Sequence, residues 1–127
     1  LKNSADDPTK HNYGGYAGQP HLQQAIKDYY GRRFGVELDT SELLPLIGSK
    51  EGLANLHLAW LDPGDLSLIP DPGYPSYYFA PMLAGGRTEP FDLLPERGWL
   101  PDFSTIPEES AKAARMLWLN YPNNLFK

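Results

Sequence analysis

Apolar residues recur at helical spacing in four stretches of the chain, and turn-forming residues separate these stretches. The first stretch follows Pro20, which suits the first turn of a helix, and Gly35 marks its end. In the second, Ser49 is placed to cap a helix whose apolar residues fall on one face. The spacing predicts helices over His21–Phe34, Ser49–Trp60 and Tyr74–Leu83, and a fourth within Asp102–Ala114.

Short apolar runs lie between these stretches and predict strands. They cover Leu43–Ile47, Leu66–Ile69, Arg87–Phe91 and Arg115–Leu119. Strands and helices therefore alternate, which predicts an α/β fold with a mostly parallel sheet and flanking helices. Residues 1–19, polar and rich in glycine, are expected to form an irregular N-terminal arm, and residues 20–127 the domain itself.

Composition narrows the class of protein. The chain has 127 residues, 41% of them hydrophobic, which is enough for one compact domain with a core. The net charge of −5 argues against a general nucleic-acid binder, and no apolar run approaches the roughly 20 residues that span a bilayer. The chain has no cysteine, which excludes disulfides and thiolate chemistry and suits a cytoplasmic protein.

Candidate chemistry lies where predicted strands end, because ligands of open α/β sheets bind at the carboxyl ends of the strands. Gly48–Gly52 joins a predicted strand to a helix start, where free N–H groups favour a phosphate. The Ser49 hydroxyl adds a donor and Lys50 a positive charge. The alternative is a turn and a helix cap without a ligand.

Two further segments occupy the same kind of position. Tyr74 follows a strand-end turn, where a planar side chain can stack on a flat ligand. The alternative is that Tyr74, Tyr77, Tyr78 and Phe79 form one core-packing cluster, and spacing alone does not single out Tyr74. Asn124 carries a donor and an acceptor that suit a ring hydroxyl or a carboxylate, and the alternative is a simple turn.

Other catalytic arrangements are not indicated. The three histidines, His11, His21 and His57, lack the spacing of metal ligands, and no Ser-His-Asp grouping is suggested. No metal site is therefore expected. His57 falls inside a predicted helix and is expected to be a packing or surface residue.

Taken in order, these segments resemble the first part of a class I/II aminotransferase of fold type I, which depends on pyridoxal phosphate. The similarity runs from about Asn12 to Asn124. The segments that carry it are Asn12–Leu22, Gly48–Leu53 (Gly-Ser-Lys-Glu-Gly-Leu), Leu61–Asp65 (Leu-Asp-Pro-Gly-Asp), Pro72–Tyr77 (Pro-Gly-Tyr-Pro-Ser-Tyr) and Pro122–Asn124 (Pro-Asn-Asn).

The resemblance implies a role for each matching residue. The N–H groups of Gly48, Ser49 and Lys50 would hold the cofactor phosphate. Tyr74 would stack on the pyridine ring. Asn124 would bind the 3-hydroxyl of that ring and help to orient the substrate carboxylate. Tyr13 would reach the phosphate in the neighbouring subunit, which implies a homodimer with shared active sites.

The sequence departs from the family after Asn124. The family continues Pro-Thr-Gly where this chain reads Leu125-Phe126-Lys127. The family's Schiff-base lysine, the aspartate that pairs with the pyridine nitrogen and the substrate-binding arginine have no counterpart in these 127 residues. We therefore expect an incomplete large domain of an enzyme that transfers an amino group from an amino acid to a 2-oxo acid, inactive by itself.

Alternatives with the same fold remain open at this point. Carbon–sulfur lyases, cyclopropane-forming synthases and regulatory domains that bind pyridoxal phosphate share these segments, and a non-catalytic phosphate-binding or interaction module is a further possibility. Among aminotransferases, the resemblance points to the branch that handles aspartate, alanine, aromatic or diaminopimelate substrates.

Overall fold

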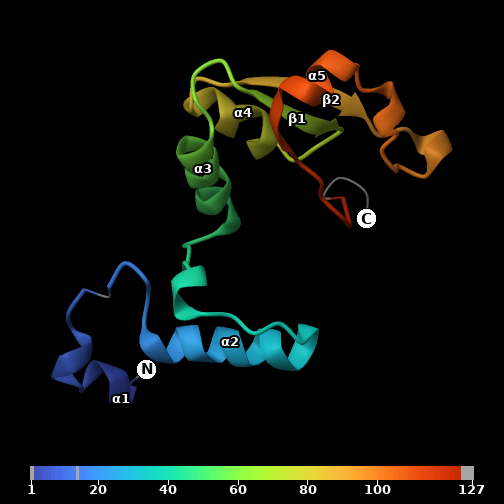
Figure 1. Ribbon diagram of the computed structural model, residues 1–127. Coiled ribbons are helices and arrows are strands. Elements are labelled where there is room, and N and C mark those ends of the chain that lie inside the picture. The colour runs from blue at the N-terminus through green and yellow to red at the C-terminus, as the bar shows by residue number, and fades with distance from the viewer. Residues whose placement is uncertain (1, 14, 124–127) are drawn as a thin grey trace. The chain divides into compact units, whose positions relative to one another are not determined.

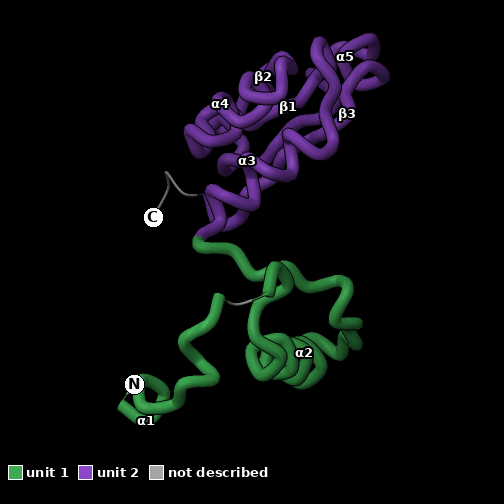
Figure 2. Tube along the Cα trace, turned by 90° about the vertical axis from the view of Figure 1, so that its left-hand side faces the viewer, with its two compact units in different colours: residues 1–47 green, residues 48–127 purple. Residues whose placement is uncertain are grey.

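A computed structural model of the protein describes residues 2–13 and 15–123. The chain separates into two compact units, unit 1 (Leu1–Ile47) and unit 2 (Gly48–Lys127), coloured green and purple in Figure 2. Each unit is compact by its own internal contacts.

Unit 1 consists mainly of helix α2 (Pro20–Phe34), with a short helix α1 (Lys2–Ala5) before it and two 3-10 turns, Pro8–Lys10 and Thr40–Glu42. The predicted first helix is confirmed to within one residue. Its proline occupies the first turn, where the missing N–H loses no hydrogen bond. Gly35 ends it in the left-handed conformation (φ +67°) and donates its N–H to the Gly31 carbonyl.

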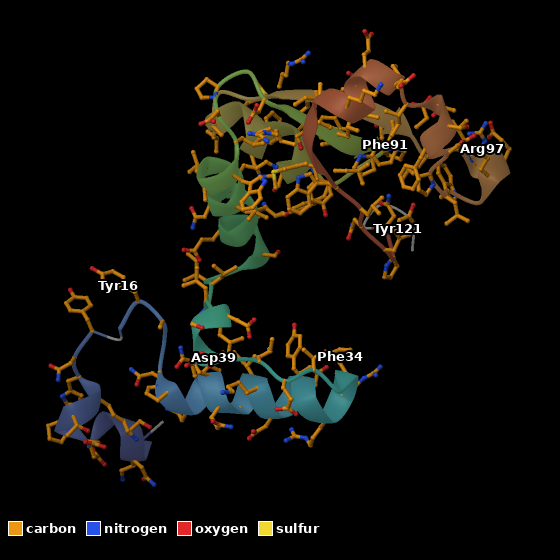
Figure 3. The ribbon with its side chains drawn as sticks, viewed as in Figure 1. Tyr16, Phe34, Asp39, Phe91, Arg97 and Tyr121 are labelled. Carbon is orange, nitrogen blue, oxygen red and sulfur yellow. The ribbon has the colours of Figure 1, made fainter. Side chains whose placement is uncertain are left out.

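Aromatic side chains gather at the carboxyl end of α2. The Phe34 ring, labelled in Figure 3, lies 5.9 Å from the Tyr29 ring and 5.3 Å from the Tyr30 ring, between centroids. The Arg33 guanidinium lies 5.1 Å from the centre of the Phe34 ring. The three rings stay exposed within unit 1, so this cluster is a surface feature of the unit.

The strand predicted over Leu43–Ile47 is wrong, because this segment is irregular in the structure. Pro45, at its centre, has no N–H to give to a sheet. Leu44 and Ile47 are exposed, the latter at 98%. The apolar run that suggested a strand is therefore not buried among the described residues.

Unit 2 is an α/β structure (Figure 1). Over residues 48–123, three strands form one parallel sheet in the order β2-β1-β3, with Leu66 of β1 opposite Arg87 and Ala114. The predicted fold class is confirmed. The elements are α3 (Ser49–Trp60), β1 (Leu66–Asp71), α4 (Ser76–Leu83), β2 (Arg87–Asp92), α5 (Glu108–Ala113) and β3 (Ala114–Leu117), with 3-10 turns at Pro95–Arg97 and Phe103–Thr105.

Several element boundaries differ from the prediction by one or two residues, including the ends of β1 and β2, which run to Asp71 and Asp92. Helix α4 begins at Ser76, so Tyr74 belongs to the turn before it. Strand β3 ends at Leu117, although the Trp118 N–H still donates to the Leu68 carbonyl at 3.0 Å. The sheet hydrogen bonding therefore extends one residue beyond the last regular strand residue.

Strand β1 is buried on both faces, as the central strand of a parallel sheet must be. On one face, Leu66 and Leu68 form the core with Phe91 and Leu93 of the neighbouring strand and its continuation; Trp99, Ile106 and Ala114 pack against this cluster. The opposite face carries Ser67 and Ile69, both fully buried, and α4 packs on the sheet. Within unit 2, β1 thus lies between α4 and α5 (Figure 2).

Over the described residues, no helix has both the length and the apolar character that crossing a membrane requires.

Two buried serines offer a test of this core. The Ser67 hydroxyl is fully buried and has no hydrogen-bond partner among the described residues, whereas the Ser110 hydroxyl donates to the Glu89 carboxylate at 2.8 Å. Since an unpaired buried hydroxyl is destabilising, we expect Ser67→Ala to raise the free energy of unfolding by about 1 kcal/mol. Ser110→Ala should lower it by a similar amount. Urea denaturation measures both, and a loss of stability in Ser67→Ala would contradict the assignment.

Candidate functional site

The amino end of α3 presents open N–H groups. Gly48, in extended backbone (φ 169°), occupies the N-cap position of α3, and Ser49 is its first helical residue. The prediction that Ser49 caps this helix is therefore wrong. The first hydrogen bond of the helix runs from the Glu51 N–H to the Gly48 carbonyl at 3.1 Å. The N–H groups before Glu51 have no acceptor within the helix. A Cβ placed on Gly48 would meet no atom within 4 Å, so a side chain at this position would meet no steric obstacle.

The end of β1 and the tight turn that follows it, here together called the β1 turn (Pro70–Tyr74), present the Tyr74 ring. The close approach of its backbone requires glycine at position 73, because a Cβ there would lie 2.3 Å from the Pro70 carbonyl oxygen. The Tyr78 hydroxyl, from α4, donates to the Asp71 carboxylate at 3.0 Å and lies 3.3 Å from the Pro70 carbonyl oxygen. Burial, the hydrogen bond to Asp71 and the charge of that carboxylate raise the pKa of Tyr78 to about 12.

The two predicted binding elements meet in one groove. The Lys50 ammonium lies 5.7 Å from the centre of the Tyr74 ring, a cation–π distance. Both side chains line a groove of about 430 Å³ between α3 and α4, together with Ala54, Pro75, Ser76, Phe79, Ala80 and Leu83. The groove is lined by a cation, Lys50, and an aromatic side chain, Tyr74, and Lys50 belongs to the first turn of α3, where N–H groups are open. This arrangement suits a flat phosphorylated molecule.

The aromatic residues around Tyr74 do not form the single core cluster that was the alternative. Tyr77 is buried, with its ring 6.0 Å from that of Tyr74 and nearly perpendicular to it. The Tyr77 ring also stacks on Trp118, with 5.2 Å between centroids and 15° between planes. Phe79, in contrast, is 64% exposed on the groove side of α4. Tyr74 is half-buried, intermediate between the buried Tyr77 and the exposed Phe79.

His57 confirms its expected packing role. Its ring is fully buried on α3, with Nδ1 at 2.5 Å from the Leu53 carbonyl and Nε2 at 2.9 Å from the Trp118 indole nitrogen. Because the indole N–H can only donate, Nε2 accepts and Nδ1–H donates. The helical position of His57 suggested burial, but no sequence signal identified Trp118 as its partner.

The third predicted segment contributes a residue that the sequence did not single out. The Asn123 side chain is buried, and its Nδ2 donates to the Pro72 carbonyl at 3.1 Å. Asn124, to which a role was assigned, lies outside the described residues. The signal that could have found Asn123 is its place after a strand end, next to Pro122, where side-chain amides fix turns.

Tyr13 lies in unit 1, and its side chain is fully exposed there. Its assignment to a neighbouring subunit stays a prediction.

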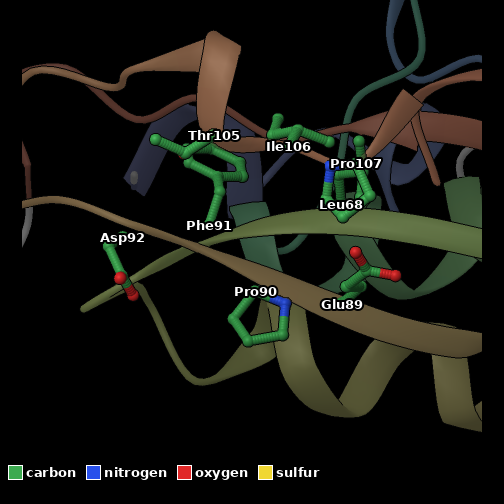
Figure 4. A pocket seen from close by; sticks show the side chains of 8 residues that line it. All are labelled: Leu68, Glu89, Pro90, Phe91, Asp92, Thr105, Ile106 and Pro107. Carbon is green, nitrogen blue, oxygen red and sulfur yellow. The ribbon is translucent and has the colours of Figure 1, made fainter. Parts of the chain in front are cut away.

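A second, smaller cavity of about 130 Å³ lies in unit 2, away from the predicted residues. Figure 4 shows Thr105, Ile106 and Pro107 on a segment that faces β1 and β2. Glu89 in its lining accepts the hydrogen bond of Ser110. Throughout residues 2–13 and 15–123, no three potential metal ligands gather in one place.

The parallel sheet and the groove define an α/β protein with a candidate site for a flat, phosphorylated ligand. The chain belongs to the class I and II aminotransferase family, whose sequence profile matches residues 1–125. Aminotransferases of this class depend on pyridoxal phosphate.

Curated relatives are similar over nearly the whole chain. The LL-diaminopimelate aminotransferase of Syntrophobacter fumaroxidans is 50% identical over 125 residues, which cover 98% of this chain and 32% of the relative. That of Aquifex aeolicus is 45% identical with the same coverage. The chain therefore spans about a third of the length of the curated relatives it matches.

Solved structures give the same result. BacF from Bacillus subtilis, in its apo form, superimposes with a TM-score of 0.89 at 37% identity, covering 97% of this chain and 33% of BacF. An aminotransferase from Staphylococcus aureus superimposes with a TM-score of 0.89 at 35% identity and the same coverage. The aminotransferase resemblance and the incomplete fold type I domain are thus confirmed.

The same substitution, glycine to serine, is expected to have opposite effects on stability at positions 48 and 73. In Gly48→Ser the new hydroxyl can cap α3, so we expect the free energy of unfolding to rise by a few tenths of a kcal/mol, about 0.5 at most. In Gly73→Ser the new Cβ would collide with the Pro70 carbonyl, so a loss of about 1–3 kcal/mol is expected. Denaturant titration measures both, and equal effects would contradict the described geometry of the two turns.

The raised pKa of Tyr78 predicts a loss of stability in alkali. Below pH 10 the phenol is neutral in both states, so its contribution is constant. Between pH 10 and 12 the unfolded chain loses this proton while the folded chain keeps it, which favours unfolding. We expect the free energy of unfolding to fall more steeply over that range in the unmodified chain than in Tyr78→Phe. Equal slopes would contradict the prediction.

Proposed function

We propose that this chain is part of an aminotransferase and binds pyridoxal phosphate in the groove between α3 and α4. The observation that carries the proposal is the 5.7 Å approach of the Lys50 ammonium to the Tyr74 ring within one groove. Family membership supports the activity, and the geometry supports the location. The chain spans about a third of the length of its curated relatives. The aminotransferase activity of the whole protein is therefore part of this proposal.

The described residues fit the cofactor in two respects. A phosphate bound at the N–H groups of Gly48, Ser49 and Lys50 would lie at the amino end of α3, next to the positive charge of Lys50. The Tyr74 ring lines the same groove and offers a flat face for the pyridine ring. Phosphate and ring would thus be held by separate elements, the start of α3 and the β1 turn.

Pyridoxal phosphate supplies an electron sink for bonds at the α-carbon of an amino acid. The residues of this chain hold and orient it. Lys50 balances the phosphate charge, and Tyr74 keeps water from one face of the ring. We extend the proposal to Asn124 as a partner of the ring hydroxyl and to Tyr13 as a contact across a homodimer.

We propose LL-diaminopimelate, an amino acid with two amino and two carboxyl groups, as the amino donor, with a 2-oxo acid as acceptor. The support comes from relatives of that name at 45–50% identity. The proposal also includes a cytoplasmic location and the predicted layout, with residues 1–19 as an arm and residues 20–127 as part of the cofactor-binding domain.

Titration with pyridoxamine 5′-phosphate tests the site, because this form of the cofactor cannot couple to surface lysines. We expect Tyr74→Ala to weaken its binding about threefold to tenfold, the effect of one lost stacking contact. Gly48→Ser should weaken it as well, because the new hydroxyl competes for the N–H groups of α3.

Inorganic phosphate is the second probe of that titration. Its affinity should fall in Gly48→Ser and stay unchanged in Tyr74→Ala. Tyr16→Ala, which removes a fully exposed tyrosine of unit 1, is the matched control and should change neither affinity. No binding of pyridoxamine 5′-phosphate to the unmodified chain, or unaltered binding in both site variants, would refute the proposed site.

A further inference from the structure

The β1 turn is held by polar contacts from two other elements. From α4, the Tyr78 hydroxyl bonds to the Asp71 carboxylate and approaches the Pro70 carbonyl. From the segment after β3, the Asn123 side-chain amide bonds to the Pro72 carbonyl. These contacts hold three successive residues, Pro70 to Pro72, and only Gly73 lies between them and Tyr74.

The Asn123 contact differs from an ordinary surface hydrogen bond. The residue is only 7% exposed, so water does not readily replace the amide as donor. Loss of the amide would leave the Pro72 carbonyl without this donor. Removing one partner of a buried hydrogen bond costs more stability than removing both. Figure 3 labels Tyr121, two residues earlier in the same segment, whose hydroxyl donates to the Trp99 carbonyl at 3.2 Å.

The turn transmits this constraint to Tyr74 because it has little room to adjust. Only Gly73 separates Pro72 from Tyr74, and its α-carbon region already lies against the Pro70 carbonyl, where a Cβ would come within 2.3 Å. A displacement of Pro72 therefore moves the backbone of Tyr74 and tilts its ring.

We propose that Asn123 is a positioning residue of the cofactor site: its amide fixes Pro72 and thereby sets the orientation of the Tyr74 ring. The inference rests on the proposed function, since it assumes that Tyr74 stacks on the cofactor. It assigns to Asn123 a role distinct from that of Asn124, which is expected to contact the cofactor itself. Asn123 acts on the ligand only through Tyr74.

The test removes the Asn123 amide donor, and the main variant keeps the size of the side chain. Asn123→Asp has the same shape but presents a charged acceptor to the Pro72 carbonyl, and Asn123→Ala is the second variant in case the charge impairs folding. Asn120→Asp makes the same change three residues earlier in the segment and is the matched control. Each variant is titrated with pyridoxamine 5′-phosphate and with inorganic phosphate, and its thermal unfolding is recorded.

We expect both Asn123 variants to bind pyridoxamine 5′-phosphate about fivefold to tenfold more weakly, the effect of one hydrogen bond. The circular dichroism induced in the cofactor band should weaken too, because it depends on how the ring is held. Phosphate affinity should not change, since the Asn123 amide bonds to the β1 turn, whereas the phosphate is proposed to bind at the start of α3. A parallel loss of both affinities would show a general structural defect, and unchanged cofactor binding would show no role; either overturns the proposal.

A measurement on the free chain separates this inference from the proposed function. If the unmodified chain does not bind pyridoxamine 5′-phosphate, the proposed function fails, and the NMR resonances of the Tyr74 ring then decide the positioning role. We expect them to shift in Asn123→Asp and to stay unchanged in Asn120→Asp. Unchanged Tyr74 resonances in Asn123→Asp would overturn the positioning role.

Discussion

The hydrogen bond between the Trp118 indole and the buried His57 ring is the interaction on which the candidate site depends. It joins α3 to the segment after β3, and the stack of Trp118 on Tyr77 adds α4 to the same cluster. The groove lies between α3 and α4, so this cluster fixes the distance between its walls. An imidazole that is fully buried needs partners for both ring nitrogens, and the structure supplies them from Leu53 and Trp118.

The sheet then determines where the polar residues meet. Strands β1 and β3 are parallel neighbours, so the β1 turn and the segment that contains Asn123 follow the same edge. The start of α3 reaches the groove differently, because no strand precedes it among the described residues. Lys50 instead comes to Tyr74 through the packing of α3 on α4. The candidate site thus lies where α3, α4 and the β1 turn meet.

Local patterns predicted the elements well, and tertiary contacts explain what they missed. Helices α2 and α3 carry spaced apolar residues between clear breakers, so their bounds were predicted closely. Leu43–Ile47 has the apolar pattern of a strand, but apolarity alone does not reveal burial, and Pro45 cannot donate a hydrogen bond to a sheet. Lys50 and Tyr74 were singled out together by the resemblance of their segments to one family, and neither by its own spacing. Asn123 and the His57–Trp118 pair were not, because their partners are 51 and 61 residues away.

The strand order also bears on how the chain is made. The central strand β1 pairs with β2 and with β3, but β3 is the last of the three to leave the ribosome. At about 5–20 residues per second, the 61 residues from His57 to Trp118 take roughly 3–12 s to synthesise. During this interval β1 has an open edge and the imidazole lacks its indole partner. Nascent chains on one messenger RNA are close neighbours, and an open β-edge is a template for pairing between chains. The speed of translation between β1 and β3 therefore sets how long this edge of the nascent chain stays unpaired.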